Sequence, residues 1–228
     1  MTSTAPRTLE QAATLSSAEL LALYRDRPAP TIDEIAGEHP SAFPRDTDGA
    51  ARDFFARQGR GHWLGKAYSA PCHDTVDGIG EGYNLWRRRD AVVRAERFAW
   101  RIEPSAIDGR DALVMRYRAF GSVSGALDLA DEVRTLVPGS LFLGIYHTRI
   151  ALPGFTGPQR GPRSEPAVFL LGPTAEPWRG VDDPSLETGH RPIAQVALGA
   201  LTAPSRTRPW VARVARRFVS GPGVSDGR

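Results

Sequence analysis

The most constraining feature of the sequence is a series of short segments between residues 62 and 172 that are rich in Val, Tyr, Phe, Trp and Leu. Clusters of Gly, Pro, Asp and Ser separate these segments, at a spacing typical of strands joined by turns. Seven sequential antiparallel strands favour a small barrel or a strongly curved sheet, because closure removes exposed sheet edges. The predicted strands are residues 62–68, 81–88, 91–102, 111–120, 127–136, 140–150 and 167–172.

Two turn signals support this order of strands. IDGRDA at residues 107–112 lies between the third and fourth predicted strands, and its glycine supplies the positive φ that a tight hairpin needs. VPGS at residues 137–140 is a second such turn. In the third strand Phe98, Trp100 and Ile102 alternate with less apolar residues, so one face of that strand is predicted to meet a core or a cavity.

The segment before these strands is predicted to be helical. Ser16 with Glu19, and Thr31 with Glu34, have the spacing of a capping box, and the second helix would stop at Gly37. Residues 48–59 form a third candidate helix that ends at a glycine. The predicted organisation is a helical flank at 1–60, a barrel at 61–172, and a loop with a helical tail at 173–228.

The tail holds most of the charge asymmetry. Residues 202–219 carry five arginines and no acid, so removing them changes the formal net charge of +3 to −2 (3 − 5). Trp210 and Phe218 would share one helical stripe, opposite Arg213 and Arg217. Such a stripe can dock on the body of the protein or bind an anionic membrane or nucleic acid. Docking is the favoured interpretation, so we expect no nucleic-acid partner.

Several familiar sites are not supported by the sequence. Cys72 is the only cysteine, which excludes an intrachain disulfide. The five histidines show no metal-ligand spacing, so no metal is expected. GSVSG at 121–125 has valine where a nucleophile elbow needs serine, and GIGEGY at 78–83 ends in tyrosine where a dinucleotide fingerprint needs glycine. Because no dinucleotide fingerprint and no metal-ligand spacing is present, we expect no cofactor. The N-terminus has no unbroken apolar run, which predicts a cytoplasmic protein.

Lys66 is the only lysine among 29 basic residues. Period-two alternation puts Leu64, Lys66 and Tyr68 on one face of the first predicted strand, and Trp63 with Gly65 on the other. If the first set faces inward, the ammonium is desolvated and its pKa falls, which makes Lys66 a candidate base, proton donor or Schiff-base amine. If Trp63 faces inward, Lys66 is a solvated strand residue. The sequence leaves both orientations open.

Several stretches resemble a bacterial family that pairs a Gly-x-Trp-x-Gly domain with a following domain of unknown function. These are LYRDRPAPTIDEIAGEHPSAFPRDTDG, WLGK, LVMRYRAFGSVSGALDLADEVRTLVPGSLFLGIY and AVFLL, which span roughly residues 23–171. The family's Trp-x-Gly-Lys is intact at residues 63–66, and its Leu-Gly pair stands at 143–144. Its first motif keeps only Gly37, and its Asp-His-Phe-Arg keeps only Asp131 and Arg134. The resemblance implies a lipocalin-like β-barrel and no established activity.

The predicted fold is therefore mainly β: an antiparallel lipocalin-like barrel with helical N- and C-terminal flanks. A barrel of about eight strands can hold one small molecule. We expect a cofactor-independent enzyme, of cyclase or isomerase type, that encloses an apolar small molecule and acts by proton transfer. A non-catalytic carrier of the same ligand class is the alternative.

The candidate site residues fall into two groups. The candidate catalytic residues are Lys66, Glu96 and Arg134. Aromatic side chains are the candidate ligand-binding residues: Trp63, Tyr68, Tyr83, Trp86, Phe98, Trp100, Tyr117 and Tyr146. Asp131 and Arg134 are expected to form an ion pair or a shared hydrogen-bond network near a strand end, since both match the family pattern.

Overall fold

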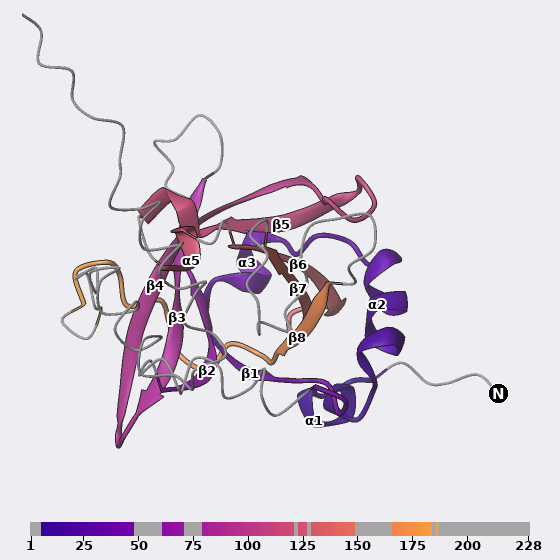
Figure 1. Cartoon of the computed structure of the whole chain (residues 1–228), viewed down its shortest axis with the longest axis horizontal. Coiled ribbons are helices and arrows are strands. Elements are labelled where there is room, and N and C mark those ends of the chain that lie inside the picture. Colours follow the sequence, from indigo (N-terminus) through magenta and orange to yellow (C-terminus); the bar gives the residue numbers. More distant parts are fainter. Residues whose placement is uncertain are drawn as a thin grey trace, which may run out of the picture. The chain divides into compact units, whose positions relative to one another are not determined.

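A computed structural model describes residues 6–47, 61–70, 79–120, 123–126, 129–148, 166–183 and 186 (Figure 1). Within these ranges eight strands form a closed antiparallel barrel, in which each strand pairs with the next and β8 pairs with β1. This confirms the predicted fold class. The strands are β1 (Gly37–Ala42), β2 (His62–Tyr68), β3 (Gly80–Arg88), β4 (Ala91–Pro104), β5 (Asp111–Arg116), β6 (Leu129–Val137), β7 (Leu141–Thr148) and β8 (Ala167–Leu171).

The barrel begins earlier in the chain than the sequence predicted. Strand β1 comes from GEHPSA, which contains a glycine, a proline and charged residues and has no strand-like pattern. Its pairing with β2 and β8 supplies what the local sequence lacks. Strand β5 is also shorter than predicted, because a 3₁₀ helix, η1 (Tyr117–Phe120), replaces its second half. The turns at Gly109 and Gly139 have the positive φ that was expected.

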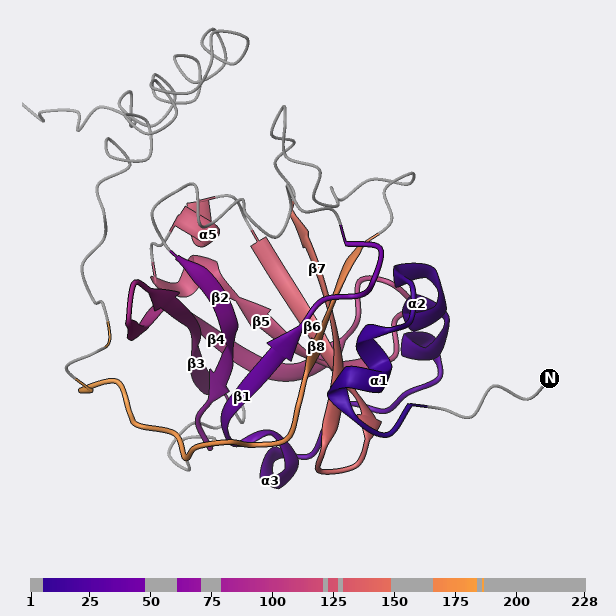
Figure 2. The same ribbon diagram turned by 90° about the horizontal axis from the view of Figure 1, so that it is seen from below.

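Three short helices precede β1 in the chain. They are α1 (Leu9–Ala13), α2 (Ser17–Arg25) and α3 (Ile32–Ile35). The capping boxes of Ser16 with Glu19 and of Thr31 with Glu34 are both present. Figures 1 and 2 show α1 and α2 beside β7 and β8, whereas α3 lies at one end of the barrel and α5 (Val123–Ala126) near the other. Helices α1 and α2 bury Leu20 and Tyr24 in a cluster with Leu143 and Ile145 of β7.

Some predicted elements lie outside the described residues. These are the helix at 48–59 and the tail from 187 onward with its arginine-rich stripe. The expectation that the tail docks on the body therefore stays a prediction.

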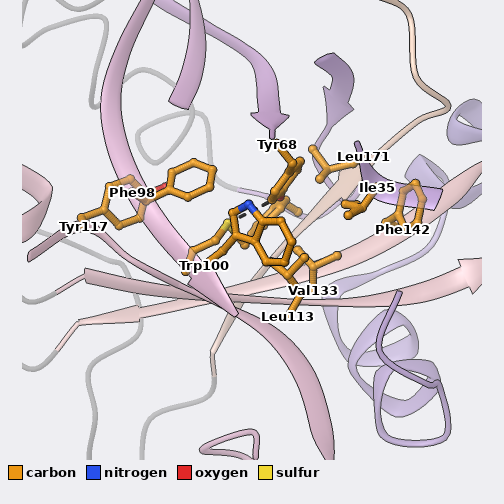
Figure 3. Packing of buried hydrophobic residues seen from close by; sticks show 11 residues of the cluster. Ile35, Tyr68, Phe98, Trp100, Leu113, Tyr117, Val133, Phe142 and Leu171 are labelled. Carbon is orange, nitrogen blue, oxygen red and sulfur yellow. Dashed lines mark hydrogen bonds between the residues drawn. The ribbon is translucent and has the colours of Figure 1, made fainter. Parts of the chain in front are cut away.

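The barrel interior is filled mainly by aromatic and aliphatic side chains. Figure 3 shows Trp100 close to Leu113 and Val133, Tyr68 next to Trp100, and Phe98 beside Tyr117. Ile35 of α3 and Leu171 of β8 belong to the same cluster. Four further hydrophobic side chains pack against it while only partly buried: Phe43, Trp63, Leu129 and Tyr146.

Glycines on β3 and β7 make room for these rings. A Cβ on Gly82 would lie 2.1 Å from the Phe98 ring, and one on Gly80 would lie 2.2 Å from the Trp100 ring. Both distances are far below van der Waals contact, so no larger residue fits without repacking. Gly80 and Gly82 of GIGEGY are therefore explained by aromatic packing, and not by a phosphate-binding loop.

Gly144 on β7 offers a test of this packing. We expect Gly144→Ala to lower the free energy of unfolding by about 1–3 kcal/mol, because the new Cβ would lie 2.0 Å from the Phe169 ring. The matched control combines it with Phe169→Leu, which removes the ring that the methyl group meets. Chemical denaturation of the two single variants and the double variant should give a double-variant loss smaller than the sum. Simple additivity would contradict the close contact.

The outer surface of β2, β3 and β4 is covered by residues 174–183 and Leu186. Trp178 stacks on Tyr83 with a centroid separation of 4.5 Å, and Leu186 packs beside Ala67 and Leu85. Backbone hydrogen bonds between Glu38 and residues 175 and 176 attach this segment to β1. These contacts mark the face of the wall that points away from the interior.

Candidate functional site

A β-bulge in β2 brings both Trp63 and Lys66 into the barrel. The pairing of β2 with β3 shifts register between Trp63 and Gly65, so strict alternation fails there. Gly65 permits the distortion, because a Cβ at this position would lie 1.9 Å from the His39 carbonyl oxygen. Leu64 consequently packs on the outer face, whereas Lys66 and Tyr68 face inward. The two orientations that the sequence set against each other are therefore not exclusive.

Lys66 is almost completely buried, with 3% of its side chain exposed. Its Nζ lies 2.6 Å from Asp131 Oδ2, 2.8 Å from Asn84 Oδ1 and 2.5 Å from the Tyr117 hydroxyl oxygen. Four aromatic rings surround the same nitrogen at 5.2–5.6 Å from their centroids: Trp63, Phe98, Tyr117 and Phe169. An ammonium has three N–H groups, and each has an acceptor here.

The residues around Lys66 complete a closed hydrogen-bond network. Asn84 Oδ1 accepts from both Lys66 and the Trp63 indole N–H, at 3.0 Å for the latter. Its Nδ2 donates to the Glu96 carbonyl oxygen and to the Tyr117 hydroxyl. Tyr117 in turn donates its proton to Asp131 Oδ2 at 2.7 Å. All the donors and acceptors of Asn84 and Tyr117 are thereby used.

One buried oxygen atom of the network lacks a hydrogen-bond donor in the part of the chain that the structure describes. Asp131 Oδ1 is buried and has no hydrogen-bond partner among the described residues. The Asp131 side chain is only 4% exposed, so bulk water does not solvate this oxygen. A buried carboxylate oxygen without a donor is costly, which makes such a group in a folded protein a sign of strain, bound water or a ligand. Asp131 itself lies on the inner face, since its cross-strand partners are Met115, which is in the interior cluster, and Tyr146, which packs against it.

Two effects act on the pKa of Lys66 in opposite directions. Burial lowers the pKa of Lys66, and the charge and hydrogen bond of Asp131 oppose that lowering. Three acceptors around Nζ favour the ammonium over the amine, which would have only two N–H groups to donate. Lys66 is thus held as a charged partner of Asp131, and its nitrogen has no lone pair free for a Schiff base.

The tyrosines offer a pH test of the buried interior. Burial raises the pKa of Tyr83 and Tyr146 to about 12, and raises that of Tyr68, Tyr117 and Tyr24 further above 10.0. These are all five tyrosines of the chain. The native state therefore keeps phenolic protons that the unfolded chain loses near pH 10.0, and stability falls as pH rises from there toward 12.

The measurement is an ultraviolet titration of tyrosinate in native and urea-unfolded protein. The unfolded control should titrate near the ordinary pKa of 10. Substantial tyrosinate in the native protein at that same pH would contradict the buried placement.

Most of the predicted aromatic residues do line the interior. Tyr68, Phe98, Trp100 and Tyr117 are buried in the interior cluster, and Trp63 and Tyr146 pack against it. Trp86 is buried and is the cross-strand partner of Trp63, which puts it on the same face.

Tyr83 was wrongly predicted to line the interior. It belongs to the outer cluster, where its hydroxyl donates to Glu38 Oε1 and its ring stacks on Trp178. Alternation along β3 explains the error, because Gly82 and Asn84 on either side of Tyr83 face inward.

Arg134 does not face the interior either, and the predicted ion pair between Asp131 and Arg134 is wrong. Three positions separate the two residues on β6, so their side chains leave opposite faces of the strand. Arg134 forms a two-pronged ion pair with Asp108, at 2.6 and 2.7 Å, in the β4–β5 turn. It also donates to the carbonyl oxygens of Tyr24 and Arg110. These contacts indicate that Arg134 holds α2 and this turn against the barrel.

The main chain and the side chain of Glu96 have different partners. It lies at a bulge of β4 with a φ of 59°, where the carbonyl oxygen turns toward Asn84. Its carboxylate accepts a hydrogen bond from the backbone N–H of Ser124 in α5, at 3.3 Å. The main chain of Glu96 thus supports the network around Lys66, whereas its side chain holds α5.

Sequence reasoning missed Asn84 altogether and assigned Asp131 the wrong partner. The signal for Asp131 was available: β6 reads LADEVRTLV, and alternation puts Asp131 with Val133 on the opposite face from Glu132 and Arg134. No comparable signal marks Asn84, whose role depends on the register of β3 with β2.

The described part of the chain has no group of three His, Cys, Asp or Glu side chains placed to hold a metal ion. In the same residues, no helix is long and apolar enough to cross a membrane. The predicted cytoplasmic location stays a prediction.

Fold and site together define a closed eight-stranded antiparallel barrel with an ion pair inside it. No family model and no curated protein matches the sequence. A crystal structure of a protein from Thermomonospora curvata is similar, with 17% sequence identity and a TM-score of 0.45. The alignment covers 70% of this chain and 88% of that one.

Proposed function

We propose that the barrel interior binds a small, largely apolar molecule and rearranges it by proton transfer to and from Asp131, without a cofactor. The observation that carries this proposal is Asp131 Oδ1, a buried carboxylate oxygen with no donor among the described residues. Every other polar atom of the Lys66, Asn84 and Tyr117 network has its hydrogen bonds. The unmatched oxygen is therefore where a bound molecule would be recognised.

The surrounding residues have positioning roles. Lys66 and Tyr117 both contact Oδ2 of Asp131, which fixes the carboxylate and leaves Oδ1 without a donor among the described residues. The Lys66 ammonium is also the counter-charge of the Asp131 carboxylate, with Nζ 2.6 Å from Oδ2. Asn84 Oδ1 accepts a hydrogen bond from the lysine, and the Trp63 indole N–H donates to the same oxygen.

The proposed reaction moves one proton within the substrate. Asp131 Oδ1 takes a proton from one carbon, forming an O–H bond, while the electron pair of the broken C–H bond shifts into an adjacent unsaturated system. The carboxyl group then returns the proton to another carbon of the same system. Atoms and electrons balance without an oxidant, reductant or co-reactant, and the product is an isomer of the substrate.

A carrier without activity is the second candidate. One observation favours it: Lys66 and Tyr117 have no hydrogen-bonding capacity left over, so Asp131 is the only group in the network that is open to a substrate. A carrier needs only recognition, which a single acceptor provides.

The experiment begins with native mass spectrometry of freshly purified protein, which should show a bound small molecule. The released compound is then incubated with ligand-free protein in deuterium oxide. An enzyme should form an isomer or introduce deuterium at carbon, and Asp131→Asn should abolish this. A bound compound that stays unchanged supports the carrier. If no bound small molecule is ever detected, both candidate functions are contradicted.

We also propose that this chain is related to the Gly-x-Trp-x-Gly family that its sequence resembles. The residues that this chain shares with the family pattern have separate structural roles. Trp63 and Lys66 belong to the interior network, and Gly65 permits the bulge that brings both inward. Asp131 carries the open oxygen, and Arg134 clamps the outer face.

A further inference from the structure

The charges of the interior restrict what kind of molecule it can hold. We propose that the site selects neutral hydrogen-bond donors, such as alcohols, over carboxylic acids and amines with the same carbon skeleton. This inference rests on the proposed function, because it requires that Asp131 Oδ1 receives a ligand. It goes further by naming the ligand's polar group.

An anionic ligand finds no donor in the network. The three N–H groups of Lys66 are directed at Asp131, Asn84 and Tyr117. The Tyr117 proton goes to Asp131, and the Asn84 amide donates to Tyr117 and to a main-chain carbonyl. The indole N–H of Trp63 is bound to Asn84. A carboxylate would therefore be buried beside the Asp131 carboxylate without compensation.

A cationic ligand is disfavoured for the opposite reason. Asp131 already has a cation on Oδ2, with Lys66 Nζ at 2.6 Å. The pair is neutral as a whole, so a second ammonium at Oδ1 would leave one uncompensated positive charge in a buried position. The rings that surround Lys66 are already engaged by its ammonium at 5.2–5.6 Å.

A neutral hydroxyl or N–H group meets neither problem. It supplies a hydrogen bond to one lone pair of Oδ1 and leaves the other lone pair for the proposed proton transfer, and a bond to an ionised acceptor is stronger than one between neutral groups. The side chains beside Asp131 on the inner face are Met115 and Tyr146, and Phe169 and Trp63 lie near the ion pair. These surfaces suit the apolar remainder of an alcohol.

The test uses two probe series of different size: decanol, decanoic acid and decylamine, and cyclohexylmethanol, cyclohexanecarboxylic acid and cyclohexylmethylamine. Isothermal calorimetry with the ligand-free full chain at neutral pH should show the alcohol of at least one series binding about tenfold or more tightly than its acid and amine. Equal or tighter binding of an acid or amine would overturn the inference while leaving interior binding intact.

Variants assign the preference to Asp131. The double variant Lys66→Met/Asp131→Leu removes the ion pair and keeps an apolar interior, so it should lose the tenfold preference. Asp111→Asn, which changes an exposed aspartate at the start of β5, is the matched control and should keep it. A preference that survives in the double variant contradicts the proposal.

If no probe binds, the compound released from freshly purified protein decides. A neutral donor supports the inference, and an acid or amine refutes it. If no probe binds and no compound is released, the proposed function fails, and this inference fails with it.

Discussion

Asp131→Ala lowers the free energy of unfolding by about 3–5 kcal/mol in our account, because it leaves the Lys66 ammonium buried without its counter-charge. The lysine side chain is 3% exposed and cannot reach bulk water without unpacking the interior. Its remaining acceptors, Asn84 and Tyr117, are neutral and do not replace a carboxylate. Equilibrium denaturation in urea measures the loss.

The matched control is the double variant Lys66→Met/Asp131→Leu. Replacing a whole buried ion pair with apolar side chains is often neutral or stabilising, so we expect it to recover most of the lost stability. The double variant thus distinguishes stability from ligand recognition, because it should stay folded while it loses the ligand-binding site. If Asp131→Ala is as stable as the unaltered protein, the pair is not buried as described.

Arg134→Met is the second variant with a large expected effect, a loss of about 3 kcal/mol in the free energy of unfolding. The Arg134 side chain is fully buried, whereas its partner Asp108 keeps 19% of its side chain exposed and is partly solvated. Removing the guanidinium also leaves the carbonyl oxygens of Tyr24 and Arg110 without their donor. Helix α2 should therefore loosen from the barrel.

Two further readouts distinguish this structural role from a role in the site. Arg134→Lys keeps the charge but not the planar fork, so it should recover only part of the stability. Any molecule bound in the interior should bind as before to either variant under conditions where they stay folded. Loss of binding from the folded Arg134→Lys protein would contradict the placement of Arg134 on the outer face.

Local signals in the sequence predicted much of the barrel. The turns at Gly109 and Gly139 and the capping box of Ser16 with Glu19 are chemical requirements of short segments, and all three appear as expected. Strand β1 was missed because its residues have no strand preference of their own, and its pairing with β2 and β8 is long-range.

The candidate site was less predictable for two physical reasons. The bulge between Trp63 and Gly65 breaks the alternation on which every inward or outward assignment depends. The network also joins β2, β3, β6 and η1 through Lys66, Asn84, Asp131 and Tyr117, and no spacing within one segment reports such a meeting. Arg134 and Tyr83, by contrast, were misplaced where alternation does hold.

A high-resolution crystal structure of freshly purified protein would show whether Asp131 Oδ1 receives a hydrogen bond from a small molecule inside the barrel. We expect an organic molecule in the interior, with an O–H or N–H donor within hydrogen-bond distance of Oδ1 and the Lys66–Asp131 pair intact. A protein donor on Oδ1, or a single water in an otherwise filled interior, would contradict this expectation.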